Sequence, residues 1–175
     1  DAVLHQKKQQ ALKELHLEQS MGKTLTDDNL QPILVLANEI QSLSKLQKEL
    51  LSYLEKTLTF YAPNLQTVAT TIIASQLIRH AGSLQRLSEM PSSTIQLLGA
   101  EKALFRHLRQ HARCPKQGLI INHPFLANVK AKDRGKRARL LTGALSIAAK
   151  VDYFKGDNSV GEKLKKELEK KAKDG

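Results

Sequence analysis

The chain has 175 residues, a formal net charge of +11 and only 4% aromatic residues. This length allows one domain with a hydrophobic core, or one such domain with an extension. A single cysteine, Cys114, excludes an internal disulfide framework and a zinc site built from several cysteines. No stretch is long and apolar enough to span a membrane. The apolar residues are mostly Leu, Ala and Ile, which favours helix over sheet.

Residues 1 to about 20 carry a partial helical stripe, which the sequence MGKTLTDDN interrupts. The chain begins at Asp1, without Met and inside this pattern, so we expect a longer natural protein. A second helix is predicted from about Asp28 to Tyr61 and would be about 50 Å long at 1.5 Å per residue. That length exceeds one small domain, so we expect residues 1–61 to form an antiparallel coiled-coil hairpin.

The second helix of this hairpin carries apolar residues at heptad-like spacing. Two interpretations are open at this point. The hairpin is either a spacer or a surface for self-association with a second copy. The residues of this stripe are Ile33, Leu36, Ile40, Leu43, Leu50 and Leu54.

A compact helical domain is predicted from 62 to 156. Pro63 ends the long helix, and Asn64 can cap the next one. Residues 65–81 have few charges and predict one buried core helix, in which His80 has a structural role rather than that of a metal ligand. Short helices are expected over 83–88 and up to Leu98.

The helix predicted from Ala100 to about His111 carries cations at spacings of four, three and four residues, which places them on one face. Leu104 and Leu108 fall opposite and are expected to contact the core, and Phe105 is expected to pack. The cations on this face are Lys102, Arg106, Arg109 and Arg113.

Positive charge is concentrated between Lys102 and Arg139. This segment holds eleven Lys or Arg and one acid, so it supplies +10 of the net charge of +11. Such a concentration indicates a surface that binds a polyanion, with a solvated basic face as the alternative.

The remaining segments are predicted from composition. A constrained loop follows Cys114, a short helix follows Pro124, and an Ala/Leu-rich helix follows the basic sequence KAKDRGKRAR and ends at about Phe154. Residues 157–175 are expected to form an exposed, charged helix or tail.

Motifs for catalysis are absent from the sequence. There is no phosphate-binding glycine loop, no H-E-x-x-H zinc motif and no G-x-S-x-G nucleophile motif. We therefore expect no enzyme activity, no catalytic residue, no metal and no cofactor.

Several ungapped blocks resemble the Nop domain family. They are GAEKALFRHLR at 99–109, with MPSSTIQLLG before it and PKQGLI and RGKRAR after it, together with APNL at 62–65, HAGSL at 80–84 and AAKVDYF at 148–154. The similarity extends from about Thr24 to Phe154. The chain looks most like the archaeal relative of the nucleolar C/D box core proteins.

The resemblance implies an all-α fold, with a long coiled-coil hairpin followed by a compact helical Nop domain. It implies a ribonucleoprotein scaffold that recognises a kink-turn guide RNA together with the small kink-turn-binding protein already bound to it. The full particle directs ribose 2′-O-methylation through a separate methyltransferase, fibrillarin. The family's fibrillarin-binding domain precedes the coiled coil and is not expected in this chain. The implied location is the cytoplasm in an archaeon or the nucleolus in a eukaryote.

The resemblance also assigns site residues. In a spliceosomal relative a histidine stacks on a flipped nucleotide. Here Asn122 aligns with that histidine, and His123 is the alternative. The RNA- or partner-binding residues that the resemblance implies are Gly99, Ala100, Glu101, Lys102, Arg106, Arg109, Arg113, Lys116, Gln117, Asn122, His123, Lys130, Lys132, Arg134, Lys136, Arg137 and Arg139.

Two other classes of function compete with the scaffold. One is a coiled-coil interaction protein whose basic face binds an acidic protein and not RNA. The other is a small helical enzyme with an unrecognised site. The scaffold predicts RNA binding that depends on the kink-turn-binding protein, the interaction protein predicts binding without RNA, and the enzyme predicts turnover by the isolated chain.

Overall fold

The computed structural model describes residues 26–127 and 129–173. These residues contain helices and no strand, which confirms the all-α prediction. The chain divides into two units between Gln47 and Lys48. The predicted first helix of the hairpin lies outside the described residues. None of the helices in the described ranges is both long and apolar enough to cross a membrane.

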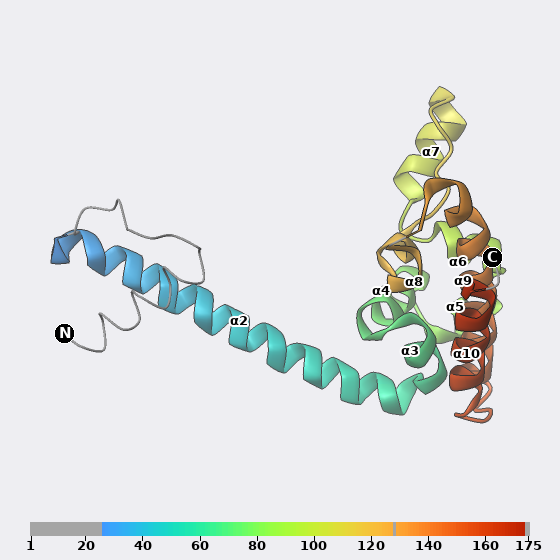
Figure 1. Cartoon of the computed structure of the whole chain (residues 1–175), viewed down its shortest axis with the longest axis horizontal. Helices are drawn as coiled ribbons and strands as arrows, with labels where there is room; N and C mark the ends of the chain where they lie inside the picture. The colour runs from blue at the N-terminus through green and yellow to red at the C-terminus, as the bar shows by residue number, and fades with distance from the viewer. Residues whose placement is uncertain (1–25, 128, 174–175) are drawn as a thin grey trace. The chain divides into compact units, whose positions relative to one another are not determined.

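Helix α2 (Asp27–Tyr61) is the predicted long helix (Figure 1). Leu, Gln, Lys and Glu dominate it, and these residues have high helix propensity. Its apolar stripe is exposed over most of its length, from Ile33 to Leu50. The end of α2 belongs to the second unit, and there Leu54 is half-buried and Leu58 is buried.

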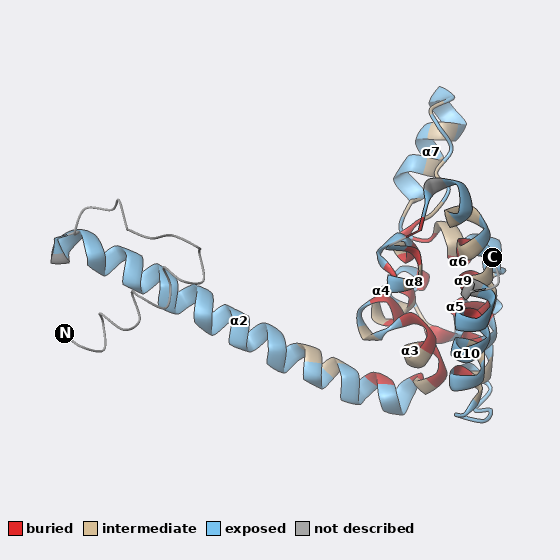
Figure 2. Cartoon of the chain, in the orientation of Figure 1, coloured by how far each residue is buried: buried red, intermediate tan, exposed pale blue. Residues whose placement is uncertain are grey.

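The second unit is a cluster of helices around α9 (Ala131–Tyr153). Figure 2 shows the buried residues of this unit where its helices meet. Small and medium side chains such as Ala138, Leu141 and Leu145 allow the neighbouring helices to approach α9 from several sides. The other elements are α3 (Pro63–Ala69), α4 (Thr71–Ala81), α5 (Leu84–Glu89), α6 (Ser92–Leu97), α7 (Glu101–Gln110), η1 (Leu119–Asn122), α8 (Pro124–Ala127) and α10 (Val160–Lys173).

The prediction of one core helix over residues 65–81 is wrong, because the chain breaks at Thr70. The φ angle of Thr70 is 70°, in the left-handed region that β-branched residues rarely adopt. Its N–H donates to the carbonyl of Gln66 at the end of α3, and its carbonyl accepts from the N–H of Ala74 at the start of α4. The chain therefore forms two separate helices here, α3 and α4, in place of the single predicted helix.

Asn64 does not cap α3, which the sequence had predicted. It lies inside the helix and is fully buried. The cap comes instead from Asp152 near the end of α9, whose carboxylate accepts from the N–H groups of Asn64 (3.1 Å) and Leu65 (2.7 Å) and from Asn64 Nδ2 (2.7 Å). A carboxylate is well suited to this place, because a helix N-terminus has free N–H groups and a positive dipole.

Most residues of helix α10 are exposed, as its charge predicted, but one side of the helix packs against the core. Gly161 is buried, and its N–H donates to Asn64 Oδ1 over 2.6 Å. A Cβ at this glycine would lie 2.8 Å from the Cα of Asn64. Leu168 is also buried, so α10 packs against α3 and α9. The second unit therefore includes the end of α2 and α10, which the predicted boundaries at residues 61 and 157 assign to separate segments.

Candidate functional site

Helix α7 projects from the second unit as part of an arm, which we define as residues 99–117. No residue of α7 is buried, and Figure 2 shows the arm as exposed along most of its length. The expectation that Leu108 and Phe105 pack against the core is wrong, because their side chains are 65% and 60% exposed. Leu104 is half-buried. The arm therefore presents apolar side chains as well as cations to its surroundings.

The two ends of the arm meet at its base. Gly118 N–H donates to the carbonyl of Gln96, and Leu119 N–H donates to that of Leu98, both over 2.8 Å. The side chain of Gln96 also donates to the carbonyl of Lys116. Position 118 requires glycine, because a Cβ there would lie 1.9 Å from the carbonyl oxygen of Leu98.

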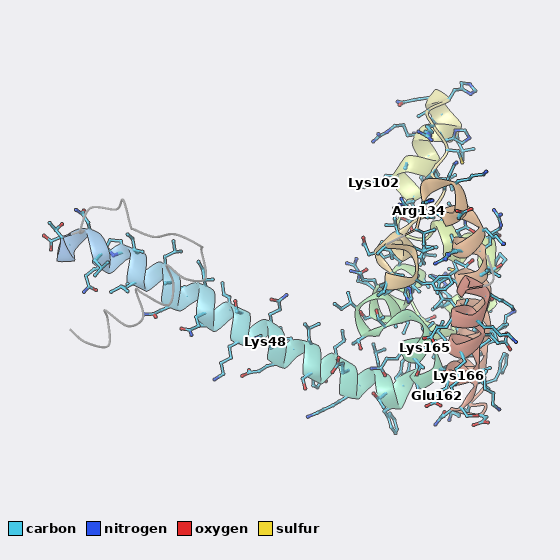
Figure 3. All side chains as sticks on the ribbon, viewed as in Figure 1. Lys48, Lys102, Arg134, Glu162, Lys165 and Lys166 are labelled. Atoms are coloured by element: carbon cyan, nitrogen blue, oxygen red, sulfur yellow. The ribbon has the colours of Figure 1, made fainter. Side chains whose placement is uncertain are left out.

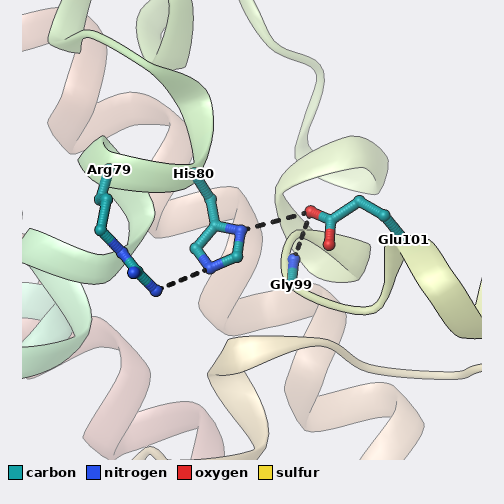
Figure 4. A network of polar contacts seen from close by, with 4 residues as sticks. All are labelled: Arg79, His80, Gly99 and Glu101. Atoms are coloured by element: carbon teal, nitrogen blue, oxygen red, sulfur yellow. Dashed lines mark hydrogen bonds and ion pairs between the residues drawn. The ribbon is translucent and has the colours of Figure 1, made fainter.

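The start of the arm is tied to α4 by a polar network (Figure 4). Gly99 turns the chain at φ +84°, and its N–H donates to Glu101 Oε1 over 2.6 Å. The same oxygen is 3.6 Å from Nδ1 of His80. Burial opposes the ionisation of Glu101, but the backbone hydrogen bonds, chiefly that of Gly99, and the attraction to His80 outweigh it and lower the pKa of the carboxyl. His80 is thus a structural residue, as the sequence predicted.

Three of the four cations predicted on one helical face lie on α7: Lys102, Arg106 and Arg109. Arg113 does not, because α7 ends at Gln110 and the next residue takes a left-handed conformation with φ 51°. Arg113 is exposed on the irregular return of the arm, as is Lys116. Gln117, which also belongs to the predicted site and lies on this return, is half-buried.

A second group of cations lies in the first turns of α9, because the basic sequence RGKRAR is helical. Figure 3 shows Arg134 of this group and Lys102 of α7 at the same end of the second unit. Lys130 precedes the helix, and the exposed cations in its first turns are Lys132, Lys136 and Arg139.

Two arginines of this second group have structural contacts. Arg134 is half-buried, and its Nη2 donates to the carbonyl of Val129 over 3.1 Å. The guanidinium of Arg137 lies 5.5 Å from the ring centroid of Phe125, which is within the range of a cation–π contact. These two side chains are therefore less available to a ligand than their exposed neighbours.

The structure does not support base stacking by His123, because its side chain is only 8% exposed. Nε2 bonds to the carbonyl of Val68 over 2.9 Å, and Nδ1 accepts from the N–H of Phe125 over 3.1 Å. Burial lowers the pKa of His123, and the charge of Lys165 adds to this effect against the opposing hydrogen bond to Val68. Asn122 is exposed at the end of η1 and stays a candidate.

Sequence reasoning missed the partners of two acidic residues, one at the start of the arm and one in the core unit. Glu101 pairs with His80, and Asp152 pairs with Asn64, across 21 and 88 positions of the chain. No local periodicity indicates contacts over such distances. The only signal was that each of these residues lies in one of the quoted family blocks.

Comparisons with known proteins place these observations in a family. Residues 1–174 match the family model Nop, described as a snoRNA binding domain, fibrillarin. An uncharacterized NOP5 family protein of Methanocaldococcus jannaschii is 47% identical over 147 residues, which are 84% of this chain and 35% of that protein. Nucleolar protein 56 of Schizosaccharomyces pombe is 38% identical over 154 residues, 87% of this chain and 31% of that protein.

A solved structure is also similar. A chain in the crystal structure of a fibrillarin/Nop5p complex matches 93% of this chain with a TM-score of 0.60 and 29% identity, over 59% of its own length. The present chain thus spans about a third of the length of the two curated relatives.

Proposed function

Because the chain belongs to the Nop family, we propose that it is a non-catalytic ribonucleoprotein scaffold. In this proposal it binds a composite surface, formed by a kink-turn C/D box guide RNA and the kink-turn-binding protein on that RNA. Binding supports assembly of the particle that guides 2′-O-methylation of RNA. The observation that carries the proposal is the arm, which holds cations outside the core at the end of the unit where α9 begins.

Positive charge without internal partners supports RNA as one half of the target. Lys102, Arg106 and Arg109 follow one another along α7 at helical spacing and are all exposed. Aligned cations repel one another, and a phosphate backbone relieves that repulsion. Phosphate contacts of this kind give affinity and salt dependence but little reading of sequence.

Exposed apolar side chains on the same helix support a protein as the other half. Phe105 lies one residue from Arg106, and Leu108 lies one residue from Arg109, so the apolar and cationic faces of α7 adjoin. RNA alone would cover the cations and leave the apolar face in water. A target made of RNA and protein covers both faces.

The surface that we propose for the RNA and its bound protein omits His123, because that side chain belongs to the core. Arg134 and Arg137 are included as residues that help to shape the surface and contribute charge. The proposed surface consists of Gly99, Ala100, Glu101, Lys102, Arg106, Arg109, Arg113, Lys116, Gln117, Asn122, Lys130, Lys132, Arg134, Lys136, Arg137 and Arg139.

Helix α2 is assigned to self-association in this proposal. Its stripe from Ile33 to Leu50 is exposed, and burial against a second copy would remove that apolar area from water. Fibrillarin is a further member of the full particle in this proposal. The scaffold would act in the nucleolus of a eukaryote or in the cytoplasm of an archaeon.

A gel-shift titration on a kink-turn RNA tests the proposal. It is run with and without the kink-turn-binding protein, at two salt concentrations. A supershift that requires the protein supports composite recognition. Equal weak binding in both cases, lost at the higher salt, contradicts it and leaves a non-specific basic surface. Binding to the protein without RNA would favour the alternative, an interaction module for an acidic protein.

A charge reversal maps the surface. Arg106→Glu with Arg109→Glu should abolish the supershift and leave the helical content unchanged, because neither side chain contacts the core. The matched control is Lys166→Glu with Lys170→Glu on α10, which changes the net charge equally. Loss of the supershift in both variants would show that total charge, and not the α7 surface, controls assembly.

A further inference from the structure

Glu101 is the only acidic residue among residues 99–117 of the sequence. It lies next to Lys102 at the start of a helix that carries cations for RNA. A carboxylate on a surface that binds a polyanion weakens that binding, because like charges repel. Its presence therefore calls for a role inside the protein.

The contacts of Glu101 point inward. Its Oε1 accepts the N–H of Gly99 over 2.6 Å and lies 3.6 Å from Nδ1 of His80 (Figure 4). On the other side of the imidazole, Nη2 of Arg79 is 3.1 Å from Nε2. A guanidinium can only donate, so Nε2 of His80 accepts, and Nδ1 carries a proton toward the carboxylate.

The arm depends on such contacts because it has no core of its own. No residue of α7 is buried, so the direction of the helix is fixed only at the base of the arm. The base is closed by the backbone pairs that Gly118 and Leu119 make with residues 96 and 98. The turn into α7 is made at Gly99, which has the widest conformational freedom of any residue type. Glu101 joins that turn to α4.

We propose that Glu101 is a positioning residue. The contact between its carboxylate and Nδ1 of His80, which we call the latch, holds α7 at a fixed angle. At that angle the cations of α7 contact the RNA while its apolar side chains contact the bound protein. The carboxylate itself does not contact the RNA. This inference rests on the proposed function and gives one residue of the proposed surface an indirect role.

Glu101→Gln separates positioning from simple electrostatics, because the two predict changes of opposite sign. The glutamine oxygen can still take the place of Oε1 beside Gly99 and His80, but the neutral amide loses the charge attraction to the Nδ1 proton of His80. Removal of one negative charge should raise the affinity for an unstructured single-stranded RNA by about two- to threefold. Loss of the latch should weaken the supershift on the kink-turn RNA with its bound protein by about three- to tenfold, a modest value because the pair is partly exposed.

The control is Asp133→Asn, which removes the one acid of the basic segment but touches no latch residue. It should raise binding to the single strand in the same way and leave the supershift unchanged or stronger. If Glu101→Gln supershifts as well as this control does, the latch has no role in assembly.

A second pair of variants tests His80 itself. The amide nitrogen of asparagine occupies nearly the same place as Nδ1 of histidine, so His80→Asn keeps a donor toward Glu101 and should retain most of the supershift. His80→Leu removes that donor and should match Glu101→Gln. Equal behaviour of the two His80 variants would overturn the latch.

The two proposals fail in different ways. Wild-type protein that gives no supershift overturns the proposed function and the latch with it. Wild-type protein that supershifts, with Glu101→Gln equal to it, overturns the latch alone.

Discussion

The cap that Asp152 provides across the core gives the sharpest stability prediction. Asp152→Asn keeps the shape of the side chain but replaces one acceptor oxygen with a donor. If the new amide takes the place of Oδ2, the backbone N–H of Leu65 faces another donor. If it takes the place of Oδ1, the backbone N–H and the side-chain amide of Asn64 both face a donor. The lost cap and the opposed donor together should cost about 2–3 kcal/mol of the free energy of unfolding. This cost lies in the lower half of the range expected for a lost cap with an opposed donor, because Asp152 is only half-buried.

Urea unfolding followed by circular dichroism measures this cost. At the slope typical of small domains, the transition midpoint should fall by about 1–2 M. Asp133→Asn is the matched control, because Asp133 is exposed and lies in the first turn of α9. An Asp152→Asn protein with the midpoint and slope of the wild type would refute the view that this carboxylate joins α3 to α9.

Three further predictions concern other parts of the chain. Gly118→Ala should lower the free energy of unfolding by about 2–3 kcal/mol, because its Cβ would overlap the carbonyl of Leu98, whereas Gly143→Ala, with open space around its Cβ, should be neutral or stabilising in the same urea experiment. Burial lowers the pKa of His123 below its usual value of 6.5, so the unfolded chain binds the extra proton first, and stability should fall as the pH drops below about 6.5; a His123→Asn protein should lose this part of the pH dependence, and an unchanged slope would contradict the assignment. Leu43→Glu on the exposed face of α2 should lower the sedimentation coefficient if that face joins two copies, while Gln41→Glu on the opposite face should not, and identical sedimentation of both would argue against self-association there.

The sequence predicted elements well where periodicity is long and local. Helix α2 was found within one residue of its predicted ends, and the helix of the arm was bounded correctly to within a residue. The break at Thr70 was missed because nothing in the local pattern indicates a left-handed threonine between two apolar segments. Such a conformation is fixed by the packing of both flanking helices and not by its own propensity.

The candidate site was only partly predictable for a similar reason. Charge spacing identified the cations of α7, since exposed side chains follow the helical repeat. The same repeat suggested that Leu108 faces a core, because amphipathic spacing does not reveal whether an apolar face meets the protein itself or solvent. The burial of His123 depends on Val68, 55 residues earlier in the chain, and no local signal predicts it.

The base of the arm has a consequence for how this chain can vary. Folding depends on the residues that close the base, above all Gly118 against Leu98, while the side chains of α7 contribute nothing to the buried core. Substitutions along α7 can therefore alter what is recognised with little penalty in folding, so the segment between Gly99 and Gln117 should be exchangeable as a block among relatives. Such a graft would transfer partner preference from one scaffold to another, provided that both ends of the block keep their backbone pairing.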